Sequence, residues 1–397
     1  MTRLRVTRDI RVPDPIRLER YRRTPELGPK ILFFSGGTAL KELSRELTVS
    51  THNSIHIITP FDSGGSSAKL RASFGMPAVG DIRNRLMALA DQTLHGNPET
   101  YVLFAYRLAK DEPRDALLAE VEEMAEGKHP LVAAIPDPMR KIIRNHLHDF
   151  LGRMTLDFDL CGASVGNLVL TSGYLANRRL LDPVIYIFSR LVEVRGVVRP
   201  VVNADAHLAV ELENGAVVCG QHRFTGKQSA PLTSPIRRIW LTADVDRPDP
   251  AEVAIREKMR TLIGEAELIC YPMGSFYSSL LANLLPRGVG SAVAANGCPK
   301  VFIPNMGRDP ELFGHELMTQ VRRLLDYARR DDPENIAESD VLDFIIVDTA
   351  RGGYSGELDA AWLSERGIEI VDQRLVNDIT PERIDAGLLA PVLLSLC

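Results

Sequence analysis

The sequence predicts an α/β fold with a parallel sheet core, a helical insert and an antiparallel β segment. Two features of the chain indicate the parallel sheet. Short apolar runs at Ile31–Phe34 and Ile55–Thr59 each stop at a cluster of Gly, Ser and Asp, and helical patterns follow the first cluster and the one at Gly80–Asn84. The alternation of strand and helix returns in the last third of the chain. Strand, glycine turn and helix in that order are typical of parallel sheets that bind a phosphorylated ligand at their strand ends.

The first elements follow from composition and spacing. Residues 1–29 are expected to form an irregular leader, because proline-containing breaks occur at 13–15 and 25–29. Residues 30–397 are expected to form a single domain, and its first α/β unit covers about 30–91. From about 96 to 154 the apolar residues recur at helical spacing without any strand pattern, which predicts a helical insert.

The pattern changes to period two at about residues 196–242, which predicts the antiparallel β segment. Strands are expected at Gly196–Val202, His207–Glu213 and Ala216–His222, with a type I′ turn at Asn214-Gly215 between the last two. After a strand at 237–242 the βα alternation resumes. Its strands are expected at 267–271, 300–304 and 341–348, and its helices at 251–264, from 276 onward and at 311–330.

Composition narrows the class of protein. The chain has 397 residues, of which 45% are hydrophobic and 25% charged, with a formal net charge of −5. Bulk attraction to nucleic acid is therefore not expected. Met1–Ile10 lacks the apolar core of a signal peptide, and no window approaches a membrane span. The five cysteines are widely spaced and odd in number, which disfavours a disulfide framework or a zinc knuckle. We expect a soluble cytoplasmic protein with a small-molecule ligand.

The turn after the first apolar run is the first candidate for phosphate binding. It reads Ser35-Gly36-Gly37-Thr38, and glycine lets a backbone approach a phosphate closely. The segment matches neither a GxGxxG fingerprint nor a P-loop, since no GK[ST] follows the glycines. A tight βα turn without ligand is the alternative interpretation.

Two acidic residues stand in the next clusters. Asp62 opens a cluster after the second apolar run, and a surface loop with an Asx-turn is its alternative interpretation. Asp81 precedes a helix, where it is either an N-cap or a ligand of a cation. In the functional interpretation Asp62 and Asp81 share a Mg²⁺ that bridges a diphosphate, with Arg83 as counter-charge. The polar and glycine residues that accompany them as candidate ligand contacts are Gly64, Gly65, Ser66, Ser67 and Asn84.

Three further clusters follow apolar runs or open helices. Their candidate ligand-binding residues are Ser164, Gly166, Asn167, Gly274, Ser275 and Asn305. So many clusters at strand ends favour one shared pocket. His207 and His222 fall in the β segment and are expected to be structural. A serine hydrolase is disfavoured because GxSxG is absent.

Taken together, these motifs resemble the CofD family, whose branches include 2-phospho-L-lactate transferase and the YvcK-type gluconeogenesis factor. The motifs occur in the family's order over about residues 30–310: FSGGT (34–38), DSGGSS (62–67), GDIRN (80–84), SVGNL (164–168), GSFYSSLLANLL (274–285) and VFIPN (301–305). The resemblance implies a Rossmann-like three-layer core, a ligand across the strand ends and a homodimer.

The motifs point to two different branches of the family. Ser35 resembles the transferase branch, whereas GGSS and GDIRN resemble the regulator branch, which binds UDP-sugars. The chain departs from the family pattern at four positions, which are Ala39, Ser63, Ala163 and Met273. Ser63 stands where a second Asp is common, and Ala163 stands at the usual histidine position. This looks like a divergent subgroup.

Two functions fit this resemblance. The first is a transferase that binds a nucleoside-diphosphate-activated donor with Mg²⁺ and moves a phospho-linked group, with Asp62, Asp81 and Arg83 as catalytic residues. The second is a non-catalytic regulator that binds a nucleotide-sugar in the same pocket. A dinucleotide-dependent oxidoreductase is disfavoured, since no GxGxxG with a ribose-binding acid occurs.

Overall fold

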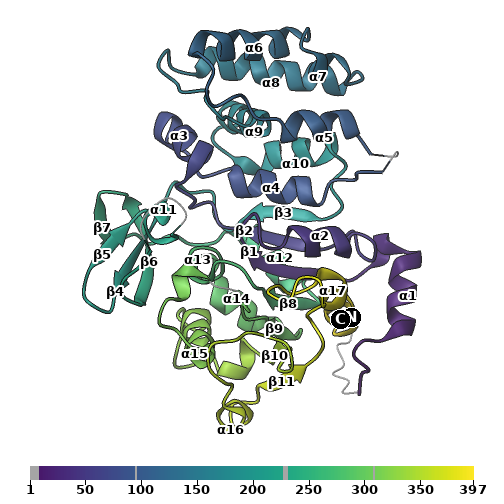
Figure 1. Cartoon of the computed structure of the whole chain (residues 1–397), viewed down its shortest axis with the longest axis vertical. Helices are drawn as coiled ribbons and strands as arrows, with labels where there is room; N and C mark the ends of the chain where they lie inside the picture. The colour runs from purple at the N-terminus through teal and green to yellow at the C-terminus, as the bar shows by residue number, and fades with distance from the viewer. Residues whose placement is uncertain (1–8, 94–95, 227–230, 307–308) are drawn as a thin grey trace.

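A computed structural model describes residues 9–93, 96–226, 231–306 and 309–397. Its centre is a seven-stranded parallel sheet with the order β11-β10-β9-β8-β1-β2-β3 (Figure 1). The strands are β1 (Ile31–Ser35), β2 (Ile55–Ile58), β3 (Val197–Pro200), β8 (Leu268–Tyr271), β9 (Lys300–Phe302), β10 (Phe344–Val347) and β11 (Glu369–Asp372).

Helices cover both faces of this sheet, because its central strands are apolar on both sides. In β1, Ile31 and Phe33 pack in one core and Leu32 and Phe34 in another, and all four are fully buried. The first core includes residues of α2 (Lys41–Leu47) and α17 (Ala386–Ser395), and the second those of α12 (Glu257–Gly264), α14 (Val289–Ala295) and α15 (Leu317–Ala328). The α/β architecture predicted from the sequence is confirmed, with three layers.

The strand order reverses between β1 and β8. From β1 the chain adds β2 and then β3 on one side, and later adds β8, β9, β10 and β11 on the other. Open parallel sheets bind their ligands outside the carboxyl ends of the strands at such a reversal. A ligand site is therefore expected at the carboxyl ends of β1, β2 and β8.

A helical block forms the upper part of the molecule in Figure 1 and surrounds its own apolar core. It extends the helical pattern predicted for 96–154 in both directions. Its helices are α3 (Gly65–Phe74), α4 (Gly80–Ala88), α5 (Pro98–Ala105), α6 (Arg114–Glu126), α7 (Pro130–Ala133), α8 (Met139–Arg153), α9 (Val165–Ala176) and α10 (Leu181–Leu191). Helix α4 also contacts β2 and β3, which joins the block to the sheet.

The antiparallel sheet has the order β5-β4-β6-β7 and lies to the left of the central sheet in Figure 1. Its elements are β4 (His207–Leu212), β5 (Val217–Cys219), the short helix α11 (Gln221–Phe224), β6 (Ile236–Asp244) and β7 (Arg247–Pro250).

The prediction that Gly196–Val202 belongs to the antiparallel segment is wrong. This stretch contains β3, which pairs in parallel with β2 at the edge of the central sheet. Its residues alternate between buried and partly exposed positions, as an edge strand's do, and this alternation resembles that of an antiparallel strand.

The hairpin between β4 and β5 is confirmed, but its turn is not type I′. Gly215 has φ of +86°, and its N–H donates to the carbonyl oxygen of Leu212. Glu213 and Asn214 therefore occupy the centre of the turn, and Asn214 is not among the non-glycine residues with positive φ. A type I′ turn requires positive φ at both central residues.

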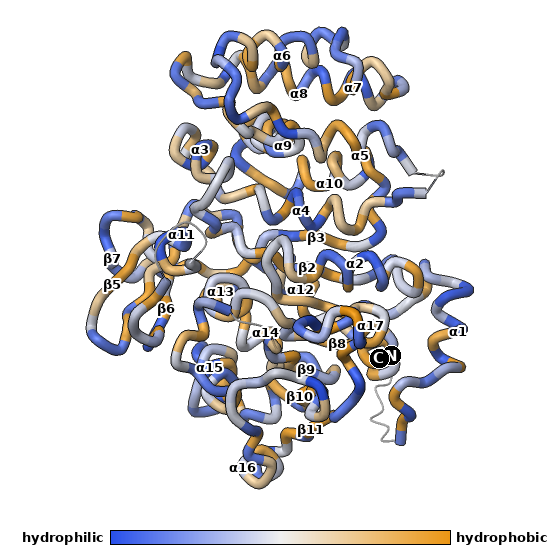
Figure 2. Tube along the Cα trace, viewed as in Figure 1, coloured by the Kyte–Doolittle hydropathy of each residue, from blue (hydrophilic) through white to orange (hydrophobic). Residues whose placement is uncertain are grey.

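The described part of the leader is not irregular, since residues 15–23 form helix α1 (Pro15–Arg23). The Asp14 side chain caps it by accepting hydrogen bonds from the N–H groups of Ile16 and Arg17, and Pro15 occupies the first turn. The proline break thus starts a helix. Arg17 Nη1 donates to the Ser395 carbonyl oxygen at 2.8 Å, which joins α1 to α17. Figure 2 shows α17 in orange and much of α1 in blue, consistent with a peripheral helix that buries none of its residues.

The remaining elements are short. They are the 3₁₀ helices η1 (Pro25–Leu27), η3 (Pro310–Leu312) and η4 (Glu338–Asp340), the π-helix η2 (Phe276–Leu281) and the α-helices α13 (Ala282–Leu284) and α16 (Ala360–Ser364). The described residues contain no helix with the length and apolar character that a membrane crossing requires.

Candidate functional site

A pocket of about 680 Å³ lies at the carboxyl ends of β1, β2 and β8. It is therefore at the reversal of strand order, where parallel sheets bind ligands. All four residues of the first glycine turn border it. The sequence-predicted residues on its wall are Ser35, Gly36, Gly37, Thr38, Asp62, Gly64, Gly65, Ser66, Ser67, Asp81, Arg83, Asn84, Asn167, Gly274 and Ser275.

Three predicted residues, Ser164, Gly166 and Asn305, are not on this wall. Ser164 is fully buried before α9. A Cβ at Gly166 would lie 3.1 Å from Cγ of Arg83, so this glycine lets α9 approach the arginine closely. Asn305 Oδ1 accepts from the N–H of Gly274 at 2.7 Å and Nδ2 donates to the Gly274 carbonyl at 2.5 Å. These residues shape the pocket from behind.

The glycine turn after β1 packs directly on Asp81. A Cβ at Gly37 would lie 2.9 Å from both Cα and Cγ of Asp81. Helix α4 begins after Val79, so Asp81 is in its first turn and is not its N-cap. Asp81 therefore reaches the turn because Gly37 has no side chain.

Buried Arg85, one helical turn after Asp81, supports the glycine turn from below. Its Nη2 donates to the Gly36 carbonyl oxygen at 2.9 Å and its Nη1 to the Leu40 carbonyl oxygen at 3.0 Å. Burial lowers the pKa of Arg85 to about 10, and Asp81 opposes this shift, so the guanidinium stays charged at neutral pH. Sequence analysis missed Arg85, although its i,i+4 spacing from Asp81 places both on one helix face.

Asp62 begins the loop that leads into α3. Its Oδ1 accepts from the N–H of Gly64 at 3.0 Å, as an Asx-turn does. Asp62 therefore forms an Asx-turn and also borders the pocket. Across the first turn of α3, Asn167 Nδ2 donates to Ser66 Oγ at 3.1 Å. This contact ties the start of α3 to α9.

The lining contains two carboxylates, Asp62 and Asp81, and two guanidinium groups, Arg83 and Arg107. Arg83 is only 7% exposed, and burial, with Arg107 as second cause, lowers its pKa to about 10. Asp81 and Tyr101 act in the opposite direction. The pocket thus holds the buried guanidinium of Arg83 and the exposed guanidinium of Arg107. Two positive charges in one pocket suit a ligand with more than one negative charge.

The start of helix η2 at the third edge of the pocket is capped by the protein's own acids. Asp309 Oδ2 accepts from the Phe276 N–H at 2.8 Å. Glu311 Oε2 accepts from the N–H groups of Tyr277 at 2.9 Å and Ser278 at 2.8 Å. The N–H groups of Phe276, Tyr277 and Ser278, which follow Gly274 and Ser275, are therefore already hydrogen-bonded to the protein's own carboxyl groups.

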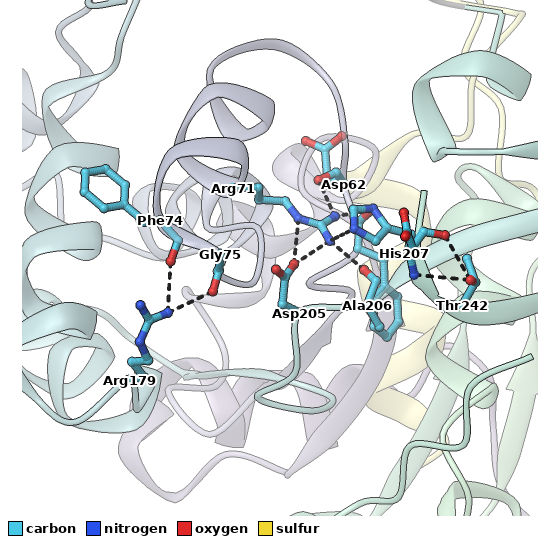
Figure 3. Close-up of polar contacts among 11 residues, drawn as sticks. Asp62, Arg71, Phe74, Gly75, Arg179, Asp205, Ala206, His207 and Thr242 are labelled. Atoms are coloured by element: carbon cyan, nitrogen blue, oxygen red, sulfur yellow. Dashed lines mark hydrogen bonds and ion pairs between the residues drawn. The ribbon is translucent and has the colours of Figure 1, made fainter. Parts of the chain in front are cut away.

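Arg71 of α3 ties the Asp62 loop to the start of the antiparallel sheet (Figure 3). Its Nη1 donates to the carbonyl oxygens of Phe61 and Asp62, both at 3.1 Å. Its Nη2 lies 2.7 Å from Asp205 Oδ1 and 2.7 Å from the Ala206 carbonyl oxygen, and 3.3 Å from His207 Nε2. One side chain that is 5% exposed thus fixes the pocket loop relative to β4.

Sequence analysis missed the residues that reach the pocket from outside the central sheet. Arg107 follows α5 in the helical block, and Gln221, His222 and Thr225 lie on or just after α11 beside the antiparallel sheet. His222 was expected to be structural. No sequence motif marks these residues, because long-range packing brings them to the strand ends.

In nucleotide-binding sites Mg²⁺ takes one or two carboxylates together with water and phosphate oxygens. Asp62 and Asp81 border the same pocket. A Cβ at Gly80, the residue before Asp81, would lie 3.9 Å from Asp62 Oδ2. Within the described ranges, no three His, Cys, Asp or Glu side chains gather into a metal-holding group. The chemistry of Asp62 and Asp81 therefore fits a Mg²⁺, which these two residues would hold.

A family model described as 2-phospho-L-lactate transferase CofD matches residues 31–376. Among curated proteins, the chain is 28% identical over 386 residues to the gluconeogenesis factor of Bacillus subtilis, covering 93% of this chain and 98% of that protein. It is 27% identical over 282 residues to the gluconeogenesis factor of Listeria monocytogenes, covering 71% of this chain and 68% of that one.

A solved structure has the same fold. It is a crystal structure of a member of the UPF0052 family from Bacillus halodurans, with a TM-score of 0.66 and 23% sequence identity. The superposition covers 92% of this chain and 99% of the other. At this identity the likeness shows the fold alone.

Proposed function

The chain belongs to the CofD family, and on this premise we propose that it binds a nucleoside-diphosphate-activated donor at the strand ends and transfers a phospho-linked group from it. One observation carries the proposal: the pocket at the strand-order reversal gathers Asp62, Asp81, Arg83 and Arg107 around a glycine turn. Cations and backbone donors suit a diphosphate, and carboxylates suit the divalent cation that accompanies it.

The transfer needs positioning and charge stabilisation more than covalent chemistry. An acceptor hydroxyl forms a bond to the phosphorus while the bond from phosphorus to the bridging diphosphate oxygen breaks. Nucleoside monophosphate leaves and the hydroxyl proton passes to water. Arg83 and the glycine turn border the pocket, and we expect the guanidinium and the turn's amides to stabilise the charge on the phosphoryl oxygens. Asp62 and Asp81 would hold Mg²⁺, which when bound offsets the charge of the diphosphate.

Metal-dependent binding and turnover test this proposal. Thermal shift is measured with GDP, UDP and UDP-glucose, each with and without Mg²⁺, since a ligand that binds the native state raises its stability. Turnover is followed as release of nucleoside monophosphate in the presence of hydroxyl acceptors. Asp62→Asn and Asp81→Asn should abolish the Mg²⁺-dependent shift and turnover, whereas Asp378→Asn, at a side chain that is 85% exposed, should leave both unchanged. Full activity in either pocket variant contradicts the mechanism.

The second candidate is a regulator that binds a nucleotide-sugar without turnover. The specific observation in its favour is that the relatives matched over most of this chain are named gluconeogenesis factors. Ser63 and Ala163, where the family commonly has an acid and a histidine, also favour it. A Mg²⁺-independent shift with UDP-glucose and no product after long incubation would support the regulator. Metal-dependent turnover would exclude it.

A further inference from the structure

A second cavity of about 480 Å³ lies where helix α10, the carboxyl end of β3 and helix α12 meet. Its wall is formed by three segments of the chain, at 180–182, 199–204 and 253–262. Of the described residues on this wall, none borders the first pocket. Cavities that hold small molecules are commonly about 300 to 1,000 Å³ in volume. The second cavity is therefore large enough for a ligand of its own.

The wall of the second cavity is mostly apolar. Its apolar side chains are those of Leu180, Val201, Val202, Val253, Met259 and Leu262. Leu180 is 37% exposed, and Val253 and Leu262 are half-buried, so part of this wall is open to water. Covering it with an apolar ligand is favourable, because apolar area is then removed from water. A hydrocarbon group is thus the part of a ligand that this wall suits.

Positive charge is in excess on the same wall. Among the described residues it carries Arg199, Arg256 and Lys258 but one carboxylate, Asp182, so two positive charges are left over. Lys258 Nζ donates to Asp182 Oδ2 at 2.6 Å, and Arg199 Nε lies 3.5 Å from Asp182 Oδ1. The exposed Arg256 side chain makes no hydrogen bond or ion pair within the described part of the chain. The cavity therefore offers a guanidinium with which an anion of the ligand can pair.

Both helices that border the cavity begin there. Leu181 is the first residue of α10, and Arg256 is the N-cap of α12. The start of a helix carries partial positive charge, because its first N–H groups have no partner within the helix. The two helix starts add to the excess of positive charge on the wall, so an anionic head group is favoured over a cationic one.

The turn that leads into α10 has an unusual backbone conformation. Arg178 and Arg179 have φ of +54° and +59°, a region that residues with a side chain seldom adopt. Asn203 holds the turn, because its Nδ2 donates to the Arg179 carbonyl oxygen at 2.8 Å and its Oδ1 accepts from the Leu181 N–H at 3.0 Å. The Arg179 guanidinium also donates to two carbonyl oxygens at the end of α3 (Figure 3). Because Leu180 and Asn203 line the cavity, this part of its wall is preformed, and a ligand loses little free energy in ordering it.

We propose that the second cavity is a binding site for a molecule with an apolar chain and one anionic head group. The chain lies along the apolar wall, and the head group pairs with the guanidinium of Arg256. Long-chain carboxylates and long-chain phosphate monoesters share this chemistry. Because the cavity shares no described wall residue with the first pocket, binding there does not depend on the proposed function.

Binding is measured first, by calorimetry on the full chain with decanoate, decyl phosphate, decan-1-ol and acetate as probes. At least one of the two charged decyl probes should bind, with one molecule per chain. Decan-1-ol lacks the charge and acetate lacks the chain, so each should bind about tenfold more weakly or worse. Tighter binding of decanoate identifies a carboxylate head group, and tighter binding of decyl phosphate identifies a phosphate. Failure of both charged probes to bind, or equal binding of decan-1-ol, overturns the proposal.

Two variants locate the bound probe. Arg256→Gln should raise the Kd of the tighter charged probe about tenfold and leave that of decan-1-ol unchanged, since only a charged head group pairs with the guanidinium. Leu262→Glu adds a carboxylate to the apolar wall and should abolish binding of both charged probes. The matched controls are Arg383→Gln, at a side chain that is 78% exposed, and Leu156→Glu, at a residue that is 93% exposed. Both lie off the wall and should bind like the wild type. An unchanged Kd in Arg256→Gln overturns the proposal, whether or not Leu262→Glu folds.

A second copy of the chain is the alternative occupant of the cavity. Sedimentation velocity on the wild type and on Leu262→Glu distinguishes it from a small ligand. A wild-type dimer that dissociates in Leu262→Glu, together with failure of both charged probes to bind, would assign the wall to a subunit interface and overturn the proposal. The same sedimentation coefficient in both proteins, with a charged decyl probe bound to the wild type, supports it.

Discussion

Glu311 is a buried acid that the fold holds behind the pocket. Its exposed fraction is 1%, and it accepts hydrogen bonds from the Tyr277 and Ser278 N–H groups and from the Ser278 hydroxyl. Burial, and secondly the charge of Asp309, raises its pKa to about 8, while these three hydrogen bonds oppose the rise. The desolvation of a fully buried carboxylate outweighs the bonds it accepts.

The raised pKa of Glu311 predicts how stability depends on pH. In the unfolded chain the pKa is near the ordinary value, so between about pH 4.5 and about pH 8 the folded state retains a proton that the unfolded state has released. The free energy of unfolding should therefore be highest below this window and fall as pH rises through it. Urea unfolding at about pH 5 and about pH 8 measures the fall.

Glu311→Gln removes the titration and keeps an amide oxygen as acceptor, so the fall should be smaller in this variant than in the wild type. Glu357→Gln, at an exposed glutamate, is the control and should follow the wild type. An identical pH dependence in Glu311→Gln and wild type would show that Glu311 is ionised in the folded state throughout the window.

At the scale of elements, the turn between β1 and α2 depends on a close approach of two backbones. Gly37 lies against Cα of Asp81, where a Cβ would be 2.9 Å away. Because that contact involves a backbone atom of α4, a rotation of one side chain cannot relieve it. The sequence predicted the glycine turn, but the contact of this turn with the backbone of α4 depends on the tertiary fold.

Gly37→Ala should therefore destabilise the protein by about 2 kcal/mol and weaken nucleotide binding, since α4 must move away from the turn. Gly152→Ala is the matched control, because the position is in helix α8 and a Cβ there meets no atom within 4 Å. Alanine in that helix should stabilise by up to about 1 kcal/mol. Urea unfolding gives both values, and calorimetry with UDP gives the Kd. Equal stability of the two variants would contradict the close approach.

The sequence predicted an element best where the local apolar pattern alone defines that element. Strands β1 and β2 are buried on both faces and read as continuous apolar runs. The helix expected from residue 276 onward does begin there, as the π-helix η2, whose first N–H groups are capped by Asp309 and Glu311. Strand β3 was assigned to the wrong sheet, because its place depends on its pairing with β2. Neither partner is local in sequence.

On the scale of the whole molecule, the pocket is where three parts of the chain meet. The central sheet supplies its floor of glycine turns, the helical block supplies Arg107, and the antiparallel sheet supplies His222 through α11. Arg71 is the clearest link among these parts, since it joins α3, the Asp62 loop and the start of β4 (Figure 3). Its loss should therefore affect stability and binding together.

Arg71→Met should lower the free energy of unfolding by about 3 kcal/mol, because it leaves Asp205 and buried carbonyl oxygens without their donor. The Kd for UDP should rise as the Asp62 loop loses its support. Arg153→Met is the control: its pair with Asp149 is 2.8 Å long, and the two side chains are 45% and 32% exposed. Because water reaches this pair, its loss should cost about 0.5 kcal/mol or less. Unfolding and calorimetry measure both effects. A neutral Arg71→Met would contradict this role.

The sequence by itself determined the α/β class, the parallel core, the family and most of the residues on the pocket wall. It did so because those features are local: glycine turns directly follow apolar strands, and parallel strands deliver their carboxyl ends to one edge. Ser35, Asp62 and Asp81 border the same pocket for this reason.

Only the tertiary structure decided which distant side chains complete the site and which clusters merely support it. Ser63 and His222 are 159 positions apart, and no local pattern reports their hydrogen bond. Asn305 follows a strand as the wall residues do, yet it braces Gly274 from behind. Spacing in a sequence reports which residues share an element, whereas the packing of elements decides which of their faces meet.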